Sequence, residues 1–142
     1  MIPLRPIVAV ALMILLASPA AAQNQQSYIQ NYFAGKAIQF AYGSGVSSNL
    51  PRVELLIHYC ASGTFFSWGR SCRPNIIAKG YQCTNLRDAG RWQVVPQGER
   101  AVLQWLSQNG GRGSAMILVR TDGVVVDTRG NPFHRIGQAQ CQ

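Results

Sequence analysis

The segment Ser114–Thr128, SAMILVRTDGVVVDT, predicts a β-hairpin and with it the fold class. Two runs rich in apolar and β-branched residues flank Asp122-Gly123. Such runs favour strands, and Asp-Gly tolerates the positive φ angles that a type I′ turn requires at both central positions. We therefore expect Val124–Thr128 to fold back on Ser114–Thr121 through a type I′ turn.

Alternation of apolar and polar residues extends this pattern towards the N-terminus. Val53, Leu55, Ile57 and Tyr59 alternate with the intervening positions, which predicts an amphipathic strand with this set facing the core. The segment Arg70–Gly90 has the least pattern and is expected to be a polar loop. The other expected strands are Lys36–Tyr42, Thr64–Gly69, Arg91–Pro96, Ala101–Ser107 and Phe133–Ile136.

About seven to nine short strands joined mostly by tight turns predict a mainly β protein, an antiparallel meander. A meander of this size closes into a small barrel or stacks as a β-sandwich, because both arrangements reduce exposed edges. We favour the barrel. One short N-terminal helix is expected, since Tyr28, Ile29, Tyr32 and Phe33 have helical spacing between a capping Ser27 and a terminating Gly35.

The first 22 residues have the features of an export signal. Arg5 is followed by the apolar stretch Ile7–Ala17 and by Ala20-Ala21-Ala22, which predicts cleavage before Gln23. Residues 23–142 then form a single disulfide-braced β domain. The apolar stretch is well below the ~20 residues that span a bilayer, so no stable membrane insertion is expected and the protein is predicted to be periplasmic or secreted.

The four cysteines predict two disulfide bonds in an oxidising compartment. Three pairings are possible. We favour Cys72–Cys83, which would close the polar loop, together with Cys60–Cys141, which would tie the tail to an interior strand. No CxxC spacing is present, and His58 and His134 are isolated from any cluster of metal ligands, so neither a metal nor a cofactor is expected.

The net charge of +8 indicates acidic partners. Removal of Arg5 with the leader lowers it to +7, since 12 Lys and Arg then face 5 Asp and Glu. Eleven of the 13 basic residues are Arg, whose planar guanidinium suits carboxylate and phosphate groups. The partner would be an acidic protein, ligand or envelope component; alternatively, the charges only keep the protein soluble. Nucleic acid is not expected, because the basic residues are scattered.

Candidate binding residues gather in or beside the expected loop Arg70–Gly90. They are Trp68, Arg70, Arg73, Lys79 and Arg87. The first hypothesis is a non-enzymatic exported binding module with an Arg-rich surface. The alternative is an inhibitor or immunity-type protein that blocks a secreted enzyme through this loop. Five aromatic residues could either fill the barrel or line a cavity for an apolar or sugar ligand. They are Phe65, Phe66, Trp68, Trp92 and Trp105.

Catalytic sets are poorly represented, so no enzymatic activity is expected. Glu54 and Asp127 are the only carboxylate pair on expected strands. If Cys60 were free, His58 and Cys60 could form a reactive pair for nucleophilic catalysis. Residues at this spacing on a strand are ~7 Å apart, however, and an exported cysteine is usually bridged.

Four short motifs resemble those of small exported bacterial β-barrel domains of lipocalin-like type. They are Cys60-Ala61-Ser62-Gly63-Thr64-Phe65, Gly90-Arg91-Trp92-Gln93-Val94, Leu103–Leu106 and the Asp122-Gly123 hairpin. The Gly-x-Trp step is similar to the motif that begins the lipocalin barrel, although it lies here in mid-chain. The resemblance covers Tyr59 to Cys141. It implies a non-catalytic barrel that binds a ligand or a protein, and it supplies no catalytic residues.

Overall fold

The computed structural model describes residues 19–43 and 51–141. Residues 1–18 of the predicted leader and residues 44–49 of the glycine- and serine-rich loop lie outside the described part. The described elements are α1 (Pro19–Phe33), β1 (Lys36–Tyr42), β2 (Arg52–Tyr59), β3 (Thr64–Asn75), β4 (Gly80–Gln97), β5 (Arg100–Ser107), β6 (Arg112–Val119), β7 (Val125–Asp127) and β8 (Phe133–Gln138).

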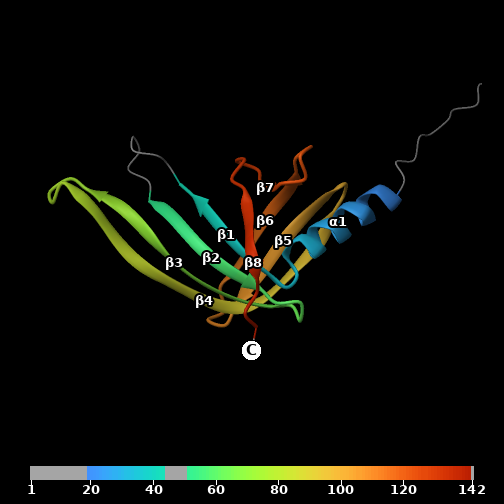
Figure 1. The fold of residues 1–142 in the computed structure, drawn as a ribbon, viewed down its shortest axis with the longest axis horizontal. Coiled ribbons are helices and arrows are strands. Elements are labelled where there is room, and N and C mark those ends of the chain that lie inside the picture. Colours follow the sequence, from blue (N-terminus) through green and yellow to red (C-terminus); the bar gives the residue numbers. More distant parts are fainter. Residues whose placement is uncertain (1–18, 44–50, 142) are drawn as a thin grey trace, which may run out of the picture.

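The strands form one antiparallel sheet that almost closes on itself (Figure 1). Its order is β7-β6-β5-β4-β3-β2-β1-β8, so consecutive strands are neighbours and only β8 returns to pair with β1. A single bridge between Val126 and Pro132 brings β7 close to the start of β8. The predicted meander and the barrel, in preference to the sandwich, are confirmed.

One type of turn connects the strands at four places. In each turn, the backbone N–H of the first residue donates to the carbonyl of the residue four positions later. The carbonyl of the first residue accepts from the N–H of a glycine three positions later, and this glycine has positive φ. This is the geometry of a three-residue loop whose glycine forms a bulge. The predicted hairpin around Asp122-Gly123 is confirmed, but its type I′ turn is wrong, because only Gly123 has positive φ. The four turns span Cys60–Thr64, Ser107–Gly111, Arg120–Val124 and Asp127–Asn131.

The expected loop Arg70–Gly90 is instead a long hairpin of two strands. β3 and β4 remain paired from Arg70 opposite Asn85 out to Asn75 opposite Gly80. β2 accompanies β3 only as far as Cys72, and β5 accompanies β4 only from Gly90 onward. The outer part of this hairpin, residues 73–82, therefore lacks other strand partners and projects from the barrel (Figure 1). We call it the arm.

Helix α1 packs into the concave face of the sheet. Ile29 and Phe33 are fully buried in the core, where Phe33 makes edge-to-face contacts with Tyr59 and Phe133. The helix ends at Phe33, and Gly35 follows with φ 72°, as its predicted stop requires. The predicted start at Ser27 is wrong: the described helix already begins at Pro19, so the predicted cleavage point before Gln23 falls inside it.

The favoured disulfide pairing is confirmed. Cys60 bonds to Cys141 and Cys72 bonds to Cys83, which leaves no free cysteine. Two such bonds indicate an oxidising, extracytoplasmic environment. Within the described residues, no helix has both the length and the apolar character needed to cross a membrane.

Candidate functional site

A groove runs over the outer face of the barrel at the root of the long hairpin. It has a volume of about 1200 Å³. Trp68, the aromatic residue predicted to bind, is 41% exposed and stacks on Phe66 and His58, with ring centroids 5.7 and 4.8 Å away. We call this the outer groove; its wall includes Leu56, Phe66, Trp68, Arg70, Arg87 and Ile136.

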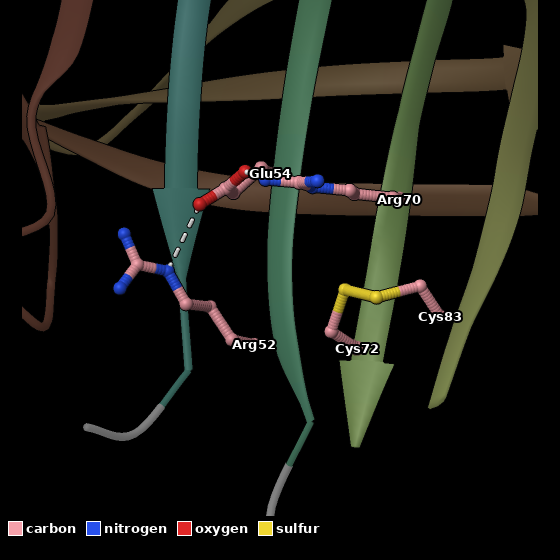
Figure 2. Close-up of a disulfide and its surroundings, with 5 residues drawn as sticks. All are labelled: Arg52, Glu54, Arg70, Cys72 and Cys83. Carbon is pink, nitrogen blue, oxygen red and sulfur yellow. Dashed lines mark hydrogen bonds and ion pairs between the residues drawn. A yellow bond between two sulfur atoms is a disulfide. The ribbon is translucent and has the colours of Figure 1, made fainter. Parts of the chain in front are cut away.

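The cations of the outer groove differ in how far their charge is already compensated. Arg70 donates hydrogen bonds of 2.9 and 3.1 Å to one carboxylate oxygen of Glu54, and Arg52 lies 3.1 Å from the other (Figure 2). Arg70 and then Arg52 hold the pKa of Glu54 below its usual range, although partial desolvation opposes them. Arg87, which faces Trp68 on the neighbouring strand, forms no ion pair among the described residues.

The five predicted binding residues are spread along one ribbon. Trp68, Arg70 and Arg87 line the outer groove, Arg73 lies on the arm, and Lys79 lies in the turn at its end. They share the β3–β4 hairpin but do not converge on one point.

Two isoleucines at the end of the arm escaped the sequence prediction. Ile76 and Ile77 are 85% and 97% exposed. The sequence contains a signal for this site, because two adjacent large apolar residues are unusual in a segment interpreted as a polar loop. It was missed because the hairpin itself was not recognised.

His58 lies on the face of β2 that points away from the core, as predicted, yet it is only 4% exposed. The C-terminal segment crosses it, and the backbone N–H of Gln140 donates to His58 Nδ1 at 2.8 Å. Its Nε2 is buried without a hydrogen-bond partner among the described residues. Burial lowers the pKa of His58. His58 and Cys60 do not form a reactive pair, because Cys60 is bonded to Cys141.

This burial predicts a loss of stability in acid. Because the pKa of His58 in the folded protein lies below the usual 6.5, the unfolded chain binds more protons. The stability that the neutral form of His58 contributes to the folded protein is complete above about pH 6.5 and is lost as the pH falls below that value. We expect the free energy of unfolding, measured with urea, to fall more between about pH 7.5 and pH 5 for the natural protein than for His58→Asn. The amide oxygen of this variant can still accept the hydrogen bond from the N–H of Gln140. Equal losses would contradict the prediction.

A second hollow lies on the concave side of the sheet and has a volume of about 630 Å³. Phe40, Leu55, Phe65 and Trp105 form part of its apolar wall, and Asp88 lies at its edge. Asp88 is held by Ser107, whose hydroxyl donates at 2.6 Å. The predicted aromatic group is thus divided, because Phe65, Trp92 and Trp105 face inward whereas Phe66 and Trp68 lie on the outer face.

The carboxylate pair considered for catalysis is not assembled. Glu54 lies on the outer groove, while Asp127 faces the inner cavity. Asp127 accepts hydrogen bonds from the backbone N–H groups of Arg129 and Asn131 and so orders its own turn. Among residues 19–43 and 51–141, no three His, Cys, Asp or Glu side chains are grouped so as to hold a metal ion.

Comparisons of the chain with protein-family models, with curated proteins and with solved structures find no significant match.

Proposed function

We propose that the protein is a non-enzymatic exported binding module whose β3–β4 hairpin recognises an acidic partner. One observation carries the proposal: between Arg70 and Arg87 the chain contains no Asp or Glu. Arg73, Lys79 and Arg87 are exposed on this hairpin and form no ion pair among the described residues. Exposed cations grouped without counter-charges attract carboxylate or phosphate groups.

The construction of the hairpin supports this use. The Cys72–Cys83 bond joins β3 to β4 at the point where pairing with β2 stops, so the two strands are tied together at the base of the arm (Figure 2). A preorganised binding element loses less conformational entropy when its partner binds. Trp68 adds an exposed ring beside Arg87 on which a planar group can stack.

Kinship with lipocalin-like exported domains and a location in the periplasm or outside the cell are part of the same proposal. They are supported by the nearly closed barrel and by the two disulfide bonds. The acidic partner would then be a protein, a small ligand or a component of the cell envelope.

Charge removal on the hairpin tests the proposal. With poly-L-glutamate as the acidic probe, the triple variant R73Q/K79Q/R87Q is expected to bind about tenfold more weakly, since each exposed contact contributes ~0.2–1 kcal/mol. Its affinity should also depend less steeply on salt. The control is R91Q/R100Q/R112Q, which removes the same charge from exposed positions on the barrel wall. Equal weakening of both variants would show that net charge alone is responsible.

The shape of the arm favours a second candidate, an inhibitor of a secreted enzyme. A narrow, disulfide-closed ribbon can enter a cleft, and a basic ribbon suits an acidic target. In that case the protein should bind one secreted enzyme at a 1:1 ratio and abolish its activity, and the R73Q/K79Q/R87Q variant should do so less well. Recovery of no enzyme from culture medium would exclude this candidate.

A further inference from the structure

We propose that the end of the arm inserts into the surface of an anionic lipid bilayer. The arm tip is defined as Arg73, Ile76, Ile77, Lys79 and Tyr81. This inference rests on the proposed function and names the acidic partner as an anionic lipid.

The three exposed large apolar side chains with the highest exposed fractions in the described part of the chain belong to the arm tip. Ile76 and Ile77 are 85% and 97% exposed, and Tyr81 is 63% exposed. Single exposed apolar residues are ordinary on protein surfaces, but here three lie together at the end of a projecting ribbon (Figure 1). Such a group indicates a surface that is covered when the protein carries out its function.

The backbone of the turn holds the isoleucines outward. The side-chain oxygen of Asn75 accepts hydrogen bonds from the N–H groups of Ile77 and Ala78, both at 3.1 Å. The Cys72–Cys83 bond closes the hairpin behind them. The turn that exposes the two side chains is thus ordered by contacts within the arm itself.

The chemistry around the isoleucines fits the surface of an anionic bilayer. Arg73 and Lys79 flank them, and no acidic residue lies between Arg70 and Arg87. Basic side chains near an anionic bilayer are attracted to its lipids, and tyrosine is favoured at the level of the headgroups. An apolar tip can then enter the boundary between headgroups and acyl chains.

The form of the tip favours a bilayer over a folded protein as its partner. The tip is the end of a two-stranded hairpin with a short turn at residues 76–79, so a protein would need a matching apolar cleft. A bilayer accepts any small convex apolar group. Since the arm projects beyond the rest of the sheet, the tip can reach the lipid while the barrel remains in water (Figure 1).

Vesicle sedimentation with the full chain tests this inference. The natural protein is expected to bind vesicles that contain phosphatidylglycerol and to bind pure phosphatidylcholine vesicles at least tenfold more weakly. The double variant I76S/I77S should lose at least tenfold in affinity for the anionic vesicles. The matched control is L106S/L118S, which removes two apolar side chains that are 42% and 36% exposed on the barrel wall and should bind unchanged.

Undiminished vesicle binding by I76S/I77S would overturn the inference, and so would the absence of vesicle binding by the natural protein. If the natural protein binds poly-L-glutamate but not vesicles, this inference fails while the proposed function stands. If it binds neither, both fail. Unfolding midpoints of the variants serve as the control that each is folded. Specific 1:1 binding to a soluble protein that requires Ile76 and Ile77 would also overturn the inference and assign the tip to a protein partner.

Discussion

Replacing Cys60 and Cys141 together by serine is expected to lower the free energy of unfolding by about 4.5 kcal/mol. The two residues are 81 positions apart, so their bond closes most of the domain into one loop. Its loss gives the unfolded chain many more conformations. Urea unfolding of both proteins under non-reducing conditions measures the difference.

The other disulfide is the natural control. Cys72 and Cys83 are only 11 positions apart, so the same relation gives about 3 kcal/mol as an upper limit. The bond also lies at the edge of the barrel, where the arm can open without exposing the core. We therefore expect C72S/C83S to destabilise the domain less than C60S/C141S and to make the arm more sensitive to proteases. The opposite ranking would show that the arm is part of the cooperative unit.

The barrel could be predicted from the sequence because its determinants are local. Alternation along each strand shows which side chains face inward, and glycine at the fourth position of the repeated turns shows where the chain reverses. The favoured pairing of cysteines was also correct, although Cys72 and Cys83 were expected to close a polar loop, whereas they face each other across a regular hairpin. The turn type at Asp122-Gly123 differs from the prediction, since three residues form the loop instead of two.

The arm could not be predicted because its strands lack a buried face. Beyond Cys72 the hairpin has solvent on both sides, and alternation of polar and apolar residues arises only where one side packs on a core. Arg70, Arg73 and Lys79 were recognised as a basic group, but their arrangement along a projecting ribbon depends on backbone pairing that composition does not encode.

The burial of His58 likewise depends on distant parts of the chain. Its alternation with Ile57 and Tyr59 placed it on the outer face, which is where the structure has it. The segment that covers it is 82 positions further along the chain, at Gln140. In the sequence, the favoured Cys60–Cys141 bond is what links that tail to His58, since Cys60 lies two residues after His58.

Truncation of Phe33 is expected to destabilise the domain by about 3–5 kcal/mol. The ring is fully buried, and it joins α1 to three strands through Tyr59, Trp92 and Phe133, with centroids 4.9, 6.4 and 5.3 Å away. Phe33→Ala leaves a cavity where the helix meets the concave face of the sheet. Because the helix is held mainly by Ile29, Tyr32 and Phe33, it should also dissociate from the barrel at lower urea concentration.

Asn31→Ala provides the control, because Asn31 is an exposed position on the same helix. Its effect should stay within about 0.5 kcal/mol, as is usual for surface substitutions. Urea unfolding followed by tryptophan fluorescence measures both variants, since Trp92 contacts the Phe33 ring. A loss below about 1 kcal/mol for Phe33→Ala would be far smaller than a buried phenylalanine gives. It would show that α1 covers the barrel without being part of its core, and that the strands alone support the β3–β4 hairpin.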